Sequence, residues 1–373
     1  QQELDATTSQ LQWIVDAYSV VFAGLLLLSG SLGDRFGRRR LFLAGLVVFG
    51  VGSTLAALAQ TAPELALCRG LMGVGGALIM PSTLSIIVTT FPDRADRARA
   101  IGIWAGVSGL GVAAGPLVGG ILLRHFTWHA VFWVNPPIVI VVLIAALALV
   151  PESCDPTRPR LDPLGAALWA VGLIALVIAI IEAPHVAETP VAYIAGAVAV
   201  VLLVAFALWE RRAPRPILPM EGFRNRVFVV CIAIVGLVYF ALFGAMFFLP
   251  QFLQLVQGKT PLESGLAILP ATLALVIASV SSSFVGASIG PRRTVILGVS
   301  LVTIGLACAS WYTVSSPAWY VSGSLVLVGV GMGLTSPFAT QGVLGAVPPE
   351  RAGVGSAVNE TVGEVGGSLG VAV

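Results

Sequence analysis

Three carboxylic acids lie inside long apolar stretches of this sequence, where a charge is costly. Asp16 belongs to a stretch near the start, while Glu360 and Glu364 lie near the end and, four residues apart, share one face of a helix. A carboxyl group held away from water favours its protonated form, so such side chains can exchange protons or pair with an organic cation. The alternative is that each acid marks a helix end already in contact with water.

One arginine, Arg69, also lies inside an apolar stretch, and small residues follow it as far as Ala77. An arginine at the centre of a bilayer costs about 2.5 to 3.5 kcal/mol on insertion scales, whereas small residues let helices pack closely. The alternative is a side chain that extends to the nearby membrane surface, because Arg69 is only a few residues inside its stretch. We predict a functional role for Arg69 within the membrane.

Glycines, one acid and several arginines crowd the segment between the first two apolar stretches. They are Gly30, Gly33, Asp34, Arg35, Gly37, Arg38, Arg39 and Arg40. Glycines permit a tight turn, and the arginines alone could simply anchor the helices at the membrane surface. Anchoring does not explain an acid among the arginines. We therefore predict a gating loop whose charges hold one state of a transporter that rocks between two conformations.

Small residues also crowd a single later stretch. They include Gly106, Gly111, Gly115, Pro116, Gly119 and Gly120. This pattern predicts a helix that bends easily and packs tightly against a neighbour.

The composition places these residues in a membrane. Of the 373 residues 57% are hydrophobic and only 10% are charged, and mean hydropathy is +0.97, which indicates that lipid is the solvent. A helix needs roughly 20 apolar residues to cross a bilayer. Apolar stretches of that kind cover residues 11–32, 41–59, 65–90, 99–122, 128–150, 163–182, 190–209, 227–252, 262–285, 294–313, 318–340 and 353–373. We predict an all-α polytopic membrane protein with twelve helices in this chain.

Basic residues are distributed unevenly among the loops. Nearly all of them follow odd-numbered spans: Arg35, Arg38, Arg39, Arg40, Arg94, Arg97, Arg99, Arg158, Arg160, Arg211, Arg212, Arg215, Arg224, Arg226, Arg292, Arg293 and Arg351. Because lysine and arginine favour the cytoplasmic side, these loops are predicted to be cytoplasmic, in a multi-pass protein of a bacterial-type inner (plasma) membrane.

The two longest polar loops divide the chain into three parts. We predict an N-terminal helical lobe at 1–150, an inserted helix pair with its linkers at 151–226 and a C-terminal lobe at 227–373. The hairpin at Gly37 is echoed at Gly290. The Gly290 hairpin follows two predicted helices of its half, whereas the Gly37 hairpin follows only one. Repeat phase and charge together predict a further helix before the first residue. The apolar end of the chain suggests another after it, fourteen in all.

Other classes of function find little support in the sequence. The four cysteines and three histidines have no metal or redox spacing, and no phosphate-binding loop is present. The arginine runs are short and explained by topology, so nucleic-acid binding is not expected. We predict no enzyme activity, no metal and no cofactor.

These motifs resemble the Major Facilitator Superfamily, in particular its fourteen-helix drug:proton antiporter branch. The segment from Gly30 to Arg40 is similar to the signature loop between its second and third helices. Arg69 with Gly73 resembles its fourth-helix motif, implicated in proton coupling, and Gly106 to Gly120 resembles the fifth-helix antiporter motif. Asp16 and the pair Glu360 and Glu364 resemble the acids of quaternary ammonium efflux pumps, although Asn359 stands where some members have a further acid.

The resemblance implies a proton-coupled antiporter that exports drug-like, cationic or lipophilic organic compounds by alternating access. Its partners would be the substrate, protons and the lipid bilayer, and the protein would be a monomer. Proton coupling or cation recognition would fall to Asp16, Arg69, Glu360 and Glu364. One alternative is a dedicated exporter of an endogenous metabolite or antibiotic. An alternative of another class is a membrane-embedded sensor or enzyme, for which the sequence offers no catalytic constellation or soluble domain.

Overall fold

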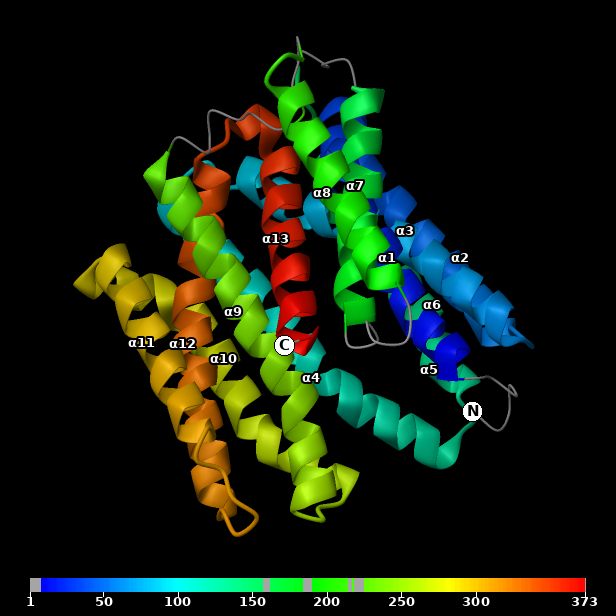
Figure 1. Cartoon of the computed structure of the whole chain (residues 1–373). Coiled ribbons are helices and arrows are strands. Elements are labelled where there is room, and N and C mark those ends of the chain that lie inside the picture. The colour runs from blue at the N-terminus through cyan, green and yellow to red at the C-terminus, as the bar shows by residue number, and fades with distance from the viewer. Residues whose placement is uncertain (1–7, 157–161, 184–189, 214–216, 218–224, 373) are drawn as a thin grey trace.

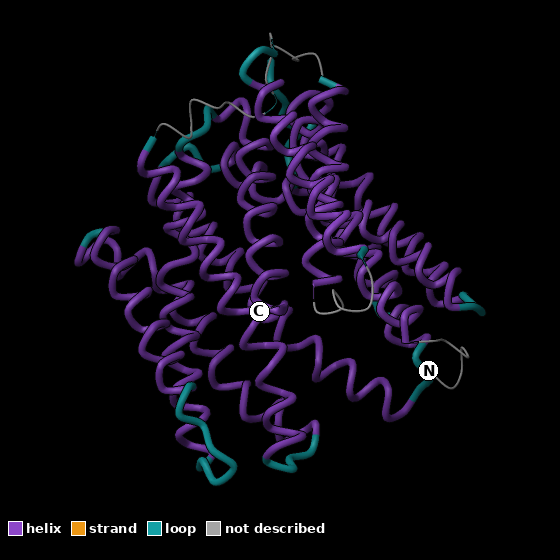
Figure 2. The backbone as a smooth tube through the Cα atoms, viewed as in Figure 1, coloured by secondary structure: helices purple, strands orange, loops and turns teal. Residues whose placement is uncertain are grey.

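The computed structural model describes residues 8–156, 162–183, 190–213, 217 and 225–372 (Figure 1). All regular elements of these residues are helices, as Figure 2 shows, so the predicted all-α fold is confirmed. The α-helices are α1 (Thr8–Phe36), α2 (Arg38–Leu58), α3 (Ala62–Thr90), α4 (Arg94–His125), α5 (His129–Trp133), α6 (Asn135–Leu149), α7 (Pro163–Glu182), α8 (Val191–Glu210), α9 (Arg226–Gln251), α10 (Pro261–Ile289), α11 (Pro291–Ala309), α12 (Ala318–Gly345) and α13 (Ala352–Ala372).

Each predicted span coincides with helix, and α5 and α6 share the span predicted at 128–150. In the described residues, ten helical segments are long and apolar enough to cross a membrane. The predicted spans outside that set are α4, which starts with a charged turn, and α13, which contains two glutamates and many glycines. The total of fourteen helices stays a prediction.

Helix ends extend beyond the apolar stretches where polar side chains support them. Thr61 and Thr260 each form a capping box with a glutamate three residues later, at the starts of α3 and α10. The gating-loop segment is helical on both sides of Gly37, which has φ 114°, and Gly290 at the equivalent hairpin has φ 89°. Both turns therefore need glycine, because other residues rarely adopt such dihedral angles.

The helices form two groups with a pair between them (Figure 1). In the N-terminal group (α1–α6), α3 packs on both α1 and α2; in the C-terminal group (α9–α13), α12 packs on α10 and α11, and α9 on α13. The pair α7–α8 lies against α1 and α13. The two groups meet where α1 packs on α13 and where α4 packs on α10. The predicted lobe boundaries themselves stay a prediction.

The upper end of the bundle in Figure 1 holds helix ends and turns that include Arg35, Arg38, Arg94 and Arg351, and we call it the arginine-rich end. There α1 turns into α2, α3 into α4 and α12 into α13. A buried apolar cluster beneath it joins Leu27 of α1, Phe228 of α9, Val343 of α12 and Val354 of α13. The same end therefore holds the two groups together.

Candidate functional site

A buried ion pair connects the two groups at the arginine-rich end. Arg38 Nη2 lies 2.7 Å from Asp34 Oδ1, and both side chains are almost fully buried. The Asp34 carboxylate also accepts hydrogen bonds from the backbone N–H groups of Gly353 (2.9 Å) and Val354 (3.2 Å) in the first turn of α13. Arg38 Nη2 donates to the backbone carbonyl of Glu350 at 2.8 Å. A carboxylate at a helix N-terminus is favoured by the helix dipole, so both charges are compensated without water.

The backbones of the two groups come into direct contact beside this ion pair. A Cβ atom added to Gly30 would collide with the Gly353 carbonyl, and one added to Gly353 would collide with Gly30 in turn. Small residues are therefore required on both sides of the crossing between α1 and α13.

The other gating-loop arginines make contacts within the N-terminal group. Arg39 donates to the Leu147 carbonyl of α6 at 2.6 Å, and the Arg35 guanidinium lies over the Phe36 ring. Gly33 has only ordinary contacts, so its position is less demanding than that of Gly30. Of the predicted gating residues, the structure brings Gly30 and Asp34 to α13 and Arg38 to the turn just before it.

Arg69 connects α3 to α1 inside the membrane. Its Nε donates to the Ile14 carbonyl at 3.0 Å, and its guanidinium carbon lies 4.8 Å from the centre of the Tyr18 ring. A cation over an aromatic face is attracted by the ring quadrupole. Arg69 therefore positions the turn of α1 that also carries Asp16.

Glu360 and Glu364 face helices from both groups. Glu360 is buried and accepts a hydrogen bond from the Asn359 side chain at 3.3 Å, while Glu364 is partly buried. Tyr239 of α9 is within electrostatic range of both glutamates, and Tyr18 of α1 is within range of Glu364. A Cβ atom added to Gly363 would lie 3.1 Å from the Tyr239 ring, so this ring packs against α13 between the two glutamates.

Asp16 lies apart from this pair. It is half-buried in α1 and within electrostatic range of Glu182 at the end of α7. In the described residues no hydrogen bond joins Asp16 to Glu360 or Glu364. The sequence analysis did not single out Tyr18, Tyr239 or Glu182. Their signal was the rarity of polar groups in apolar helices.

The glycine-rich helix α4 packs tightly over only part of its length. Gly102 accepts a hydrogen bond from Ser279 of α10 at 3.0 Å, and Gly106 faces Val276 and Val280 of the same helix. A Cβ atom added at Gly111, Gly115, Gly119 or Gly120 would meet no atom of the described residues within 4 Å. Pro116 lies in this second half. The tight packing predicted for α4 therefore holds near the arginine-rich end.

A bundle of membrane-length helices in two groups, with buried charges where the groups meet, defines a polytopic membrane transporter. The chain belongs to the Major Facilitator Superfamily, whose family model matches residues 1–371. It is therefore a multi-pass membrane protein and a transporter rather than an enzyme. Within the described residues no cluster of histidine, cysteine or acidic side chains could hold a metal ion.

Relatives of this chain are efflux and resistance proteins. It is 38% identical over 367 residues to the multidrug efflux pump LfrA of Mycolicibacterium smegmatis, covering 98% of this chain and 73% of LfrA. It is 35% identical over 376 residues to the methylenomycin A resistance protein of Streptomyces coelicolor, covering 100% of this chain and 78% of that protein. The crystal structure of the human organic anion transporter MFSD10 has the same fold, with a TM-score of 0.69 at 16% identity, covering 97% of this chain and 76% of MFSD10.

Proposed function

We propose that this protein exports drug-like, lipophilic organic cations in exchange for protons. The observation that carries the proposal is Glu360, a carboxyl group buried in α13 where the two groups of helices meet, with Glu364 one turn further along. A buried carboxyl group is stable when it is neutral or when a cation compensates its charge. Protons and cationic substrates then compete for the same groups, which is the requirement for exchange.

The exchange cycle assigns roles to each predicted acid. Protons entering from outside protonate Asp16 or the pair Glu360 and Glu364 and displace the bound cation to that side. After the two groups of helices rock, protons leave to the cytoplasm and the free carboxylates bind the next cation. Arg69 holds α1 in place through Ile14 and keeps a positive charge near Asp16.

Alternating access in this proposal uses the ion pair of Asp34 and Arg38 as a latch. Its hydrogen bonds to Gly353 of α13 and to Glu350 just before that helix keep the arginine-rich end closed, and their release opens that end. We infer that this end is cytoplasmic, because the arginines favour that side. The glycine motif of α4 supports the antiporter assignment, and the protein would function as a monomer within the fourteen-helix branch of the family, with lobes at 1–150 and 227–373 around the pair at 151–226.

A second candidate is a dedicated exporter of one antibiotic. Its support is the similarity to the methylenomycin A resistance protein. Substrate profiling separates the two: resistance to many unrelated cations supports the multidrug pump, and resistance to one compound family supports the dedicated exporter.

The deciding experiment measures ethidium transport in everted membrane vesicles that contain the full-length protein. Wild type should accumulate ethidium when the vesicle interior is acidified, and a protonophore should abolish the accumulation. Glu360→Gln and Asp16→Asn should lose most of this activity. Asp96→Asn is the matched control, because the Asp96 side chain is 58% exposed, in a surface ion pair with Arg99. Transport that persists with all three acids, Asp16, Glu360 and Glu364, made neutral would refute the role of these carboxyl groups.

A further inference from the structure

The chain that leaves α6 lies against the turn between α1 and α2 before it leads into α7. Two backbone hydrogen bonds join it to that turn: Arg38 N–H donates to the Ser153 carbonyl at 2.9 Å, and Asp155 N–H donates to the Asp34 carbonyl at 2.6 Å. Asp34 and Arg38 are the partners of the buried ion pair. The backbone of both latch residues is thus held by one segment from a distant part of the chain, residues 151–155, which we call the strap.

Glu152 of the strap supplies the cap that α2 lacks. The N-cap residue of α2 is Gly37, which makes no side-chain cap hydrogen bond. The Glu152 carboxylate instead accepts from the backbone N–H of Arg39 at Oε1 and of Arg40 at Oε2, both at 3.2 Å. A carboxylate in this place satisfies N–H groups that have no partner within the helix, and the helix dipole favours its charge. Glu152 therefore fixes the first turn of α2, which also carries Arg38.

Gly37 leaves the space that this carboxylate occupies. A Cβ atom added at Gly37 would lie 2.6 Å from Glu152 Oε1 and 2.7 Å from its Cδ. Glycine is thus required at this position for a second reason besides its φ of 114°. A side chain from the strap takes the place that the side chain of an N-cap residue takes in other helices.

Further contacts hold the strap on the N-terminal group of helices. Ser153 Oγ lies 3.3 Å from Thr89 Oγ1 in the last turn of α3. Arg40 Nε lies 3.6 Å from Glu152 Oε2, but the Arg40 side chain is 77% exposed, and ion pairs at the surface contribute little. The two backbone N–H groups are therefore the stronger link between Glu152 and α2.

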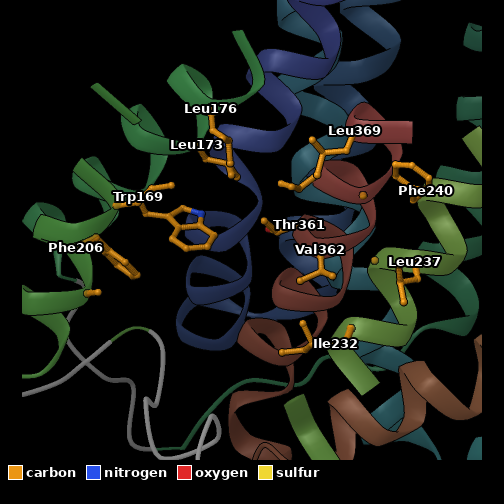
Figure 3. Close-up of a pocket in the computed structure, with 16 residues that line it drawn as sticks. Trp169, Leu173, Leu176, Phe206, Ile232, Leu237, Phe240, Thr361, Val362 and Leu369 are labelled. Carbon is orange, nitrogen blue, oxygen red and sulfur yellow. The ribbon is translucent and has the colours of Figure 1, made fainter. Parts of the chain in front are cut away.

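The strap leads into a helix pair that packs closely on the same group. A Cβ atom added at Gly24 of α1 would lie 2.6 Å from the Ile174 side chain of α7. On the other side, an apolar cavity of about 720 Å³ lies between α7–α8 and the helices α9 and α13, and none of its lining residues is charged (Figure 3). The strap can therefore keep Asp34 and Arg38 in place while α13 moves away.

We propose that Glu152 is a positioning residue of the latch: by capping α2, it holds the Arg38 guanidinium where it reaches Asp34 and the Glu350 carbonyl. The inference rests on the latch of the proposed function and adds to it a residue outside the gating loop. The hydrogen bonds of Glu152 in the described residues lie within the first turn of α2 and the strap. Its effect on α13 is therefore transmitted through the ion pair.

Maleimide labelling of Ser356→Cys tests this role, because Ser356 is fully buried in α13 and is reached only when the arginine-rich end opens. The full-length protein is labelled in membranes, in a background without native cysteines. Glu152→Ala should raise the labelling rate about fivefold, as expected for the loss of one helix cap. Glu152→Gln keeps one acceptor oxygen and should lie between Glu152→Ala and wild type. If Glu152→Ala fails to fold, judged by gel-filtration elution, Glu152→Gln answers the question alone.

Glu263→Ala is the matched control for the loss of a cap. Glu263 also accepts a backbone N–H group at a helix start, from Thr260 at 2.8 Å, but it does so at α10 in the C-terminal group. This variant should be labelled at the wild-type rate. A rate as high as that of Glu152→Ala would mean that the loss of any cap loosens the bundle, and would overturn the assignment.

A double substitution separates positioning from a general loss of stability. If Glu152 acts through the ion pair, Glu152→Ala should not accelerate labelling further in a protein that already carries Asp34→Asn, since the latch is broken there. If the two accelerations multiply, Glu152 acts independently of the ion pair, and the positioning role is overturned.

The outcomes keep this role apart from the rest of the proposed function. Faster labelling in Asp34→Asn with a wild-type rate in Glu152→Ala overturns the positioning role and leaves the latch intact. A wild-type rate in Asp34→Asn overturns the latch and the positioning role with it. An Arg40→Gln rate equal to that of Glu152→Ala assigns the effect to the surface ion pair and overturns the cap. The expected labelling pattern in a protein without proton-driven ethidium transport supports the role of Glu152 and overturns the exchange.

Discussion

Asp34 and Arg38 form a buried ion pair; Asp34 also accepts a hydrogen bond from Gly353 in the first turn of α13, and Arg38 donates one to the Glu350 carbonyl just before that helix. The pair is thus completed only while α13 stays next to α1. If the two helices separate, a carboxylate and a guanidinium lose partners in a poorly hydrated place, and the cost is avoided only if water enters. The proposed latch therefore predicts two distinct arrangements of the arginine-rich end, the closed and dry one seen here and an open, hydrated one.

Asp34→Asn should destabilise the closed arrangement. It leaves the Arg38 charge buried without a carboxylate, and removal of one partner of a buried ion pair typically costs about 3 to 5 kcal/mol. We expect a lower thermal midpoint and faster maleimide labelling of Ser356→Cys, a buried α13 position, in a background without native cysteines.

Arg40→Gln is the control for Asp34→Asn. The Arg40 side chain is 77% exposed in its ion pair with Glu152, and such surface pairs contribute about 0 to 1 kcal/mol. Equal labelling rates for the Asp34 and Arg40 variants would argue against the latch.

Gly30→Ala should separate α1 from α13 by steric overlap alone, without any change in charge. The added methyl group collides with the Gly353 backbone, which cannot move aside as a flexible side chain would. The same labelling of Ser356→Cys should accelerate and transport should fall. Gly196→Ala in α8 is the control, because its added Cβ would lie 3.8 Å from the Ala179 side chain, an ordinary contact. An unaffected Gly30→Ala variant would mean that the helices are not in contact there.

Tyr18→Phe should preserve the position of Arg69, whereas Tyr18→Leu should not. Phenylalanine keeps the ring beneath the guanidinium, and leucine removes a cation–π contact that is 4.8 Å long and contributes about 0.5 to 2 kcal/mol. The thermal midpoint and the ethidium transport rate of both variants test this. A Phe variant as impaired as the Leu variant would shift the role of Tyr18 to its hydroxyl group, near Glu364.

Binding of a permanent organic cation should tighten as the pH rises. Tetraphenylphosphonium does not titrate, so any pH dependence of its Kd reports protons on the protein. If one carboxyl group must lose its proton before the cation binds, each rise of one pH unit lowers the Kd by at most about tenfold. This slope applies while that carboxyl group is still mostly protonated. Calorimetry across a pH series should show this slope in wild type. A slope that survives neutral replacement of Asp16, Glu360 and Glu364 would place the titrating group elsewhere.

Much of the architecture was predictable from the sequence, because lipid imposes a simple rule on each segment separately. A backbone in hydrocarbon must satisfy its own hydrogen bonds, so a run of about 20 apolar residues forms a helix whatever its neighbours are. The same rule makes an isolated charge conspicuous, and it singled out Asp16, Arg69 and the two glutamates of α13 before their surroundings were known. The apolar pattern placed the last residue of the first helix at 32 and the first residue of the second helix at 41. The helices run to Phe36 and from Arg38, because charged side chains can continue a helix beyond the apolar core.

Only the tertiary structure decided which of these residues act together. Asp34 and Gly353 are more than 300 positions apart, and no spacing in the chain indicates that a carboxylate in one helix bonds to the first turn of another. The same holds for Tyr239 of α9, whose ring packs at Gly363 of α13, and for Arg69 of α3 over the Tyr18 ring of α1. Such contacts arise from the packing of complete helices, in which many small apolar contacts together fix the orientation of each face. The sequence by itself determined the class of protein and its candidate charges, while helix packing determined which partners Asp34, Arg38 and Arg69 find in distant parts of the chain.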